Sequence, residues 1–159
     1  MKIKNNYRIL SGLCSVLLGA FLTTSAVYSQ DAAAAKEVEI TGNDTMKFSL
    51  ATIEVSPGQE VKLTLKNVGK LPKQAMGHNW ILLKSGSDVM AYGAAASKHA
   101  AADYIAPELA EQVLAHTKLL GPGESDTITF TAPTEPGSYP FICSFPGHVA
   151  LMKGELIVK

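Results

Sequence analysis

The sequence predicts an all-β fold, a sandwich or barrel of short strands, and three features support this. Apolar and polar residues alternate at a period of two, clearly at 61–66 and 127–131, which is typical of a strand with one buried face. Pro-Gly turn signals at 57–58, 122–123 and 136–137 separate the apolar runs. Because no strand–helix–strand rhythm is visible, antiparallel pairing is favoured.

The individual elements follow from the same pattern. Strands are expected in chain order at 38–40, 48–55, 61–66, 79–84, 127–131, 139–143 and 154–158. The alanine-rich segment 94–116 departs from this pattern, because Ile105, Leu109 and Val113 recur at four-residue spacing. Pro107 stands where a helix could begin, ahead of two glutamates that would favour the positive end of its dipole. We therefore expect one helical insertion, packed outside the sandwich by that apolar stripe.

The N-terminal residues 1–29 are typical of an export signal. Three basic residues precede an uncharged apolar stretch at 10–22, and small residues follow. That stretch is shorter than the roughly 20 residues that a membrane span needs, although an uncleaved anchor is the alternative. We expect cleavage near Ala26 or Ser29, and a periplasmic mature protein with no membrane span.

The remainder is expected to form a spacer at 30–36 and a single domain at 37–159. Removal of the signal takes away three of 14 basic residues and none of 14 acidic ones. The mildly acidic remainder argues against nucleic acid and anionic membrane surfaces as partners. It also retains only one of two cysteines, Cys143, so no internal disulfide can form. A lone thiol in an oxidising compartment needs burial or ligation.

A cluster of metal-binding residue types surrounds that cysteine. Cys143, His148 and Met152 occur at Cys-x4-His-x3-Met spacing, and His78 stands 65 residues upstream. One Cys, two His and a weak axial Met are the ligand set of blue-copper electron-transfer sites. Zinc prefers four strong ligands in a tetrahedron, and a thioether is a poor fourth. The set therefore predicts copper, whereas His116 is expected to be an ordinary residue near the end of the helical insertion.

Four segments, 41–46, 71–80, 115–121 and 143–154, carry a resemblance to the azurins of the cupredoxin family. The resemblance extends over about 38–159. It implies a Greek-key sandwich of two sheets, with about eight strands and the metal at one end. Residues 41–46 read Thr-Gly-Asn-Asp-Thr-Met, and the last segment is highly specific.

The resemblance also implies the roles of individual residues. It assigns His78, Cys143 and His148 as equatorial ligands of one copper ion, and Met152 as a distant axial ligand. The backbone carbonyl of Gly77 becomes a second weak axial contact. The backbone N–H groups of Asn79 and Phe145 are expected to point at the Cys143 sulfur.

The function implied is electron transfer by cycling between Cu(II) and Cu(I), without bond chemistry. The partners implied are redox proteins such as c-type cytochromes or a copper or haem reductase. An apolar docking patch is expected around the edge of His148, formed by Leu71, Phe145, Pro146 and Val149. Two features differ from the family: no cysteine pair matches its usual N-terminal disulfide, and Asn67 stands where many azurins carry histidine.

Two other functions remain as alternatives. A copper delivery or storage protein would need an exchangeable site, usually with several clustered Met or Cys, whereas the methionines here are scattered. An enzyme would use Cys143 and His148 as a nucleophile–base pair, but no acidic residue stands nearby to orient the histidine.

Overall fold

The computed structural model describes residues 34–159. The expected export signal, its cleavage and most of the spacer lie outside the described residues. Among residues 34–159, no helix has the length and apolar character needed to cross a bilayer.

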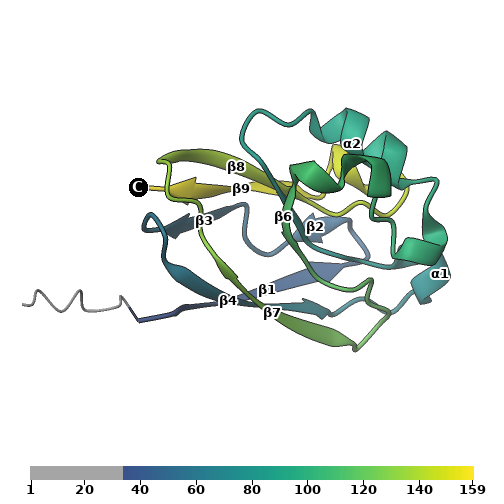
Figure 1. The fold of residues 1–159 in the computed structure, drawn as a ribbon. Helices are drawn as coiled ribbons and strands as arrows, with labels where there is room; N and C mark the ends of the chain where they lie inside the picture. The colour runs from purple at the N-terminus through teal and green to yellow at the C-terminus, as the bar shows by residue number, and fades with distance from the viewer. Residues whose placement is uncertain (1–33) are drawn as a thin grey trace, which may run out of the picture. The chain divides into compact units, whose positions relative to one another are not determined.

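The described chain forms two β-sheets that face each other (Figure 1). The four-stranded sheet has the order β2 (Lys47–Phe48), β1 (Lys36–Asn43), β4 (Glu60–Asn67) and β7 (Ser125–Thr131). The five-stranded sheet has the order β3 (Thr52–Val55), β9 (Lys153–Val158), β8 (Gly137–Ile142), β5 (Ile81–Leu83) and β6 (Val113–His116). The predicted all-β, two-sheet sandwich is confirmed. The expected strand at 48–55 is instead two strands, β2 and β3, one in each sheet.

Strand direction differs in part from the antiparallel expectation. Most neighbours are antiparallel, but β1 pairs with β4 in parallel, and so does β3 with β9. In the first pair Ile40 stands opposite Leu65. The chain leaves the four-stranded sheet to form β3 and then returns, so β4 runs in the direction of β1. Alternating burial is the same for either direction, and the sequence pattern therefore could not specify it.

The core lies between the sheets and follows the predicted alternation. Val61, Leu63 and Leu65 on β4 are fully buried, while the residues between them are not. Trp80 is also fully buried, with its ring centroid 5.5 Å from that of Phe141. Each such side chain contributes about 1.5–3 kcal/mol by leaving water. The well-packed core thus makes the sandwich rigid, and the candidate site lies at one end of it.

The helical insertion begins and ends earlier than expected, at Val89 and Gln112, and is less regular. It consists of α2 (Val89–Ala96) and two 3-10 turns, Ala100–Ala102 and Pro107–Gln112. The prediction that it extends to 116 was wrong, because β6 pairs with β5 and places His116 opposite Ile81 at an exposed position. The one-turn helix α1 (Lys73–Met76) and a 3-10 turn at His148–Ala150 complete the elements.

The apolar stripe of the insertion packs as expected although its backbone is not one helix. Ile105, Leu109 and Val113 all pack against a buried cluster that includes Tyr92 and Val149. Leu109 has non-helical dihedral angles, with φ −117° and ψ 19°. The four-residue spacing therefore correctly indicated that the three side chains share a buried face. A 3-10 turn followed by a strand provides such a face as well as a continuous helix does.

Candidate metal centre

Three metal-binding side chains meet at one end of the sandwich. The ligand atoms of His78, Cys143 and His148 all lie within 4.8 Å of one another, and all three residues are buried. The Cys143 Sγ lies 3.5 Å from Nδ1 of His148 and 3.9 Å from Nδ1 of His78. Within residues 34–159, no other group of three such side chains could hold a metal ion in this way. The three side chains that the sequence predicted as ligands thus lie close together.

The loop between β8 and β9 brings the cysteine and the second histidine together. Cys143 follows β8 directly, and its N–H donates to the Met152 carbonyl at 2.9 Å. The Met152 N–H donates in turn to the His148 carbonyl at 2.7 Å. Gly147 turns the loop with φ +83°, a conformation that glycine adopts without steric cost. Two short hydrogen bonds thus tie Met152 to both neighbouring metal-binding residues.

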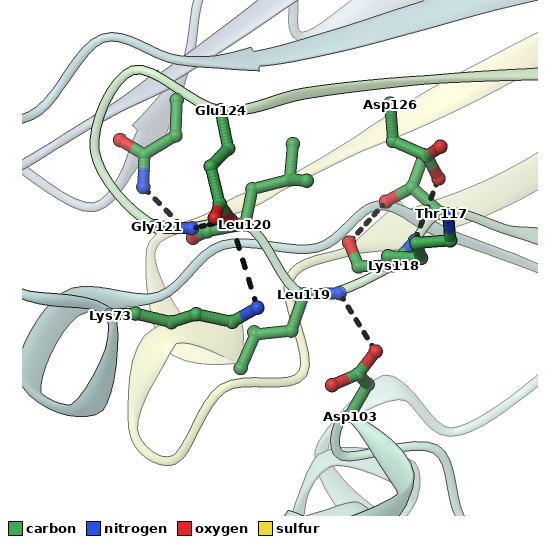
Figure 2. Close-up of polar contacts among 10 residues, drawn as sticks. Lys73, Asp103, Thr117, Lys118, Leu119, Leu120, Gly121, Glu124 and Asp126 are labelled. Carbon is green, nitrogen blue, oxygen red and sulfur yellow. Dashed lines mark hydrogen bonds and ion pairs between the residues drawn. The ribbon is translucent and has the colours of Figure 1, made fainter.

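His78 is held from the other side, by the segment that precedes β7. His78 and Leu120 exchange backbone hydrogen bonds at 3.0 and 2.8 Å. Figure 2 shows how polar contacts fix this segment: Glu124 accepts from the Gly121 N–H at 2.7 Å, and Asp126 from the Lys118 N–H at 2.9 Å. The backbone partner of His78 is therefore rigidly placed.

Asn67 contributes to the same support. Its side-chain amide donates to the Leu120 carbonyl at 3.0 Å, and its Oδ1 accepts from the Gly69 N–H at 2.9 Å. The residue is 2% exposed. The position where many azurins carry a histidine is thus a buried structural amide that contacts the segment paired with His78.

Burial favours the neutral forms of the three groups. It raises the pKa of the Cys143 thiol from 9.0 to about 12, and the backbones of Asn79 and Phe145 oppose this rise. Burial, and then the neighbouring His78, lower the pKa of His148 from 6.5 to about 4. Burial also lowers the pKa of His78, against the nearby Asn43 backbone. Near neutral pH the site therefore offers two unprotonated imidazole nitrogens and a thiol whose proton a cation can replace.

Met152 and Gly77 lie next to the three side chains. Met152 is fully buried and packs with Cys143 in a small apolar cluster. A Cβ at Gly42 would lie 2.6 Å from the Met152 Cε and 3.1 Å from the His78 Cδ2, so both side chains crowd against that glycine. The Gly77 carbonyl oxygen lies 4.0 Å from the Cys143 Sγ. Sequence reasoning did not single out Gly42, although it lies in the matching segment 41–46.

This chemistry has counterparts among known proteins. Residues 34–159 match the family described as copper binding proteins, plastocyanin/azurin family. The chain belongs to that family. Azurin from Bordetella pertussis is 43% identical over 151 residues, covering 88% of this chain and 95% of the relative. Azurin from Pseudomonas aeruginosa is 42% identical over 132 residues, covering 80% of this chain and 87% of the relative.

Solved structures of the family have the same fold. Reduced auracyanin from Roseiflexus castenholzii superposes with a TM-score of 0.69 and is 35% identical, covering 78% of this chain and 97% of the other. The azurin Az-iso2 from Methylomonas sp. strain J gives a TM-score of 0.69 at 31% identity, covering 78% and 98%. The predicted cupredoxin-like sandwich is confirmed.

The donor set fits the copper of this family. Two imidazole nitrogens and a thiol sulfur converge in a buried site, with a thioether and a backbone carbonyl next to them. Soft sulfur ligands combined with imidazole are suited to copper, and a distant thioether is a weak axial donor. The chain is therefore a copper protein, and this site is the one among the described residues that offers such donors.

The expected docking patch needs a correction. Leu71 is 45% exposed and Pro146 is exposed, but Phe145 and Val149 are only 8% and 7% exposed. Val149 packs against Gly93 of α2, where a Cβ would come within 2.7 Å of the Val149 Cγ1. Val149 is therefore a core residue rather than a surface contact.

Phe145 instead covers the site. Its ring centroid lies 4.7 Å from that of His148, which is itself 3% exposed. Leu151, at 58% exposure, is a surface residue near the site that the sequence reasoning did not include. Its place directly before Met152 was the available signal.

Proposed function

We propose that this protein transfers single electrons through one type 1 copper ion that alternates between Cu(II) and Cu(I). Nδ1 of His78, Nδ1 of His148 and the Cys143 thiolate would be the equatorial ligands, with Met152 and the Gly77 carbonyl as weak axial contacts. The observation that carries this proposal is the convergence of one sulfur and two Nδ1 atoms within 4.8 Å, in a member of a copper-binding family. Copper supplies the one-electron couple when bound.

The residues of the chain make this couple fast by holding the ligands still. Ligands on rigid elements change position little between two oxidation states. Here Cys143 is hydrogen-bonded to the residue before β9, and His78 to the segment before β7. Burial excludes water, and the unprotonated imidazoles need no proton transfer on copper binding. Backbone N–H groups of Asn79 and Phe145 would stabilise the thiolate, whereas Pro146 has none to give.

The copper delivery alternative has less support. Delivery requires access to the ion, but His78 and Met152 are fully buried and His148 is 3% exposed. Among the other methionines of the described chain, Met46 is partly buried and packs against the cluster that holds Cys143 and Met152, whereas Met76 and Met90 are not part of it. Membership of an electron-transfer family also assigns the chain to carriers rather than enzymes.

We further propose a periplasmic location and redox partners such as c-type cytochromes or a copper or haem reductase. The family supports redox partners in general, and the export-type residues 1–29 support secretion. The docking face would include the exposed apolar side chains of Leu71 and Pro146. Weak redox encounters use small interfaces of this kind.

One titration tests the proposal. Addition of Cu(II) should give an intense blue band from Cys143 sulfur-to-copper charge transfer, which one-electron reduction should bleach. The electron paramagnetic resonance spectrum should show a narrow copper hyperfine splitting, because the thiolate bond is covalent. Cys143→Ser should lose the colour while the sandwich stays folded. A colourless copper complex of the unaltered protein would refute the proposed function.

A further inference from the structure

Two consecutive residues of the insertion have an unusual backbone. Asp103 and Tyr104 have φ angles of +53° and +60°, although neither is glycine. Left-handed conformations are unfavourable for residues with a Cβ and persist only where surrounding contacts determine them. The contacts of this pair therefore show what the turn is for.

The turn directs two successive carbonyl groups at the metal centre's neighbours. The Asp103 carbonyl accepts from the Asn79 side-chain amide at 2.8 Å, and the Tyr104 carbonyl accepts from the Ser144 hydroxyl at 2.6 Å. Asn79 follows His78 directly, and Ser144 follows Cys143. The Ser144 N–H also donates to the Asn79 Oδ1 at 2.9 Å, so the two are joined.

The side chains of the turn reach two further parts of the site. The Tyr104 ring meets the Phe145 ring edge-on, with 5.1 Å between centroids, and Phe145 covers His148. The Asp103 carboxylate accepts from the Leu119 N–H at 3.3 Å (Figure 2). Leu119 in turn packs against Gly77, where a Cβ would lie 3.1 Å from its side chain.

We propose that Asp103 and Tyr104 are positioning residues that hold the copper ligands from outside the sandwich. This inference rests on the proposed function but concerns a different element, the insertion. The turn joins Asn79 and Ser144 in one hydrogen-bond network. Its Tyr104 ring packs against Phe145, which in turn packs against His148. Asn79 and Ser144 are 0% and 1% exposed. Without the turn the Asn79 amide would keep only the Ser144 Oγ as a partner at 2.9 Å, and the Ser144 hydroxyl only a 3.3 Å contact with the Asn79 Oδ1, so the network would be less rigid.

Hydrogen exchange of the copper-free protein tests the proposal without the metal. Ser144→Ala removes the donor to the Tyr104 carbonyl and also the hydroxyl that accepts from the Asn79 side-chain amide at 2.9 Å. Ser97→Ala is the matched control, because Ser97 also donates its hydroxyl to a carbonyl of the insertion, that of Ala94 at 2.8 Å, but is exposed. We expect exchange of the Cys143 amide to rise at least tenfold in Ser144→Ala and to stay unchanged in Ser97→Ala. Equal exchange in both variants would overturn the proposal.

Two further variants separate positioning from simple stabilisation. Asp103→Gly still allows the left-handed turn, because glycine adopts a positive φ freely. It makes the turn more flexible and removes the carboxylate that accepts from the Leu119 N–H. We expect its melting temperature to stay within about 5 °C of the unaltered protein while exchange at Cys143 rises several-fold. In Tyr104→Leu only the contact with Phe145 is lost, so exchange should rise at His148 and not at Cys143. Unchanged protection in Asp103→Gly would refute the role even if Ser144→Ala fails to fold.

The copper-loaded forms give an independent readout. Ser144→Ala should shift the thiolate-to-copper band and slow electron self-exchange about tenfold, while Ser97→Ala should change neither. If the unaltered protein is blue and no variant differs from it, the positioning role is wrong and the proposed function stands. If the unaltered protein is colourless, the function fails, while hydrogen exchange still decides on the turn.

Discussion

Copper uptake should release one proton per ion at neutral pH, because the buried Cys143 thiol is protonated in the copper-free protein. The thiol has its pKa raised to about 12, so at pH 7 about one copper-free molecule in 10⁵ holds a thiolate. Since the thiolate is the form that binds metal, the proton must leave. His148, whose pKa is lowered to about 4, is already neutral at that pH and contributes none.

The same shift sets the size of the effect. The rise in the Cys143 pKa from 9.0 to about 12 corresponds to roughly 4 kcal/mol that opposes an ionised thiol in the empty site. Between about pH 9 and 11 the apparent affinity for Cu(II) should therefore still rise about tenfold for each pH unit, whereas for a thiol of pKa 9.0 the rise would level off. Copper, rather than the protein alone, must supply the energy to expel the proton.

Calorimetric titration with Cu(II) in two buffers of different ionisation enthalpy measures the proton count. We expect one proton per copper for the unaltered protein and none for Cys143→Ser. A blue complex that forms without proton release would mean that the backbones of Asn79 and Phe145 outweigh burial and that the thiol is already ionised. Two protons at pH 7 would mean that an imidazole is charged in the empty site.

Four further predictions concern the site and its surroundings. The copper-free protein should lose stability as the pH falls from about 6.5 to about 4, because His148 takes up its proton more readily when unfolded; chemical denaturation should show this, and a flat profile would contradict it. Met152→Leu should raise the reduction potential and keep the blue colour, since a weak donor to Cu(II) is lost. Gly42→Ala should displace the Met152 methyl and raise the potential in the same way. In a protein that already carries Met152→Leu, Gly42→Ala should not change the potential. The potential should stay nearly flat between about pH 5 and 8, the histidine range, and Asn67→His should make it rise as the pH falls, which voltammetry can measure. Leu71→Glu should slow electron self-exchange and leave the optical spectrum intact, and an unaffected rate would place the electron exit elsewhere.

The sequence was most informative where structure depends on local pattern. The alternation at Val61, Leu63 and Leu65 correctly marked one buried face, because successive side chains of a strand point to opposite sides. The spacing from Cys143 to Met152 identified the metal-binding loop, because its residue types are rare in combination. Strand direction lay beyond such reasoning, since β1 and β4 bury the same residues whether parallel or antiparallel.

The insertion shows why spacing alone cannot specify a backbone. Ile105, Leu109 and Val113 pack on one cluster, so their four-residue spacing did report burial. A continuous helix would have used Val113 as its last turn, but Val113 is instead the first residue of β6 and stands opposite Leu83 of β5. Sheet hydrogen bonds from a distant strand decided the outcome, and they are not visible in a local pattern.

The burial of Val149 limits how far the ligand loop can move. The sequence placed Val149 on the ligand loop, where an exposed apolar contact was expected, but α2 covers it because Gly93 has no side chain to keep the helix away. Figure 1 shows α2 beside this loop, and the Asp103 turn of the same insertion holds the loop's other neighbours. A loop supported in this way can move little when a partner docks. If the partner docks on the exposed side chains of Pro146 and Leu71, as proposed above, its shape, more than any adjustment of the loop, should decide which proteins exchange electrons with this site.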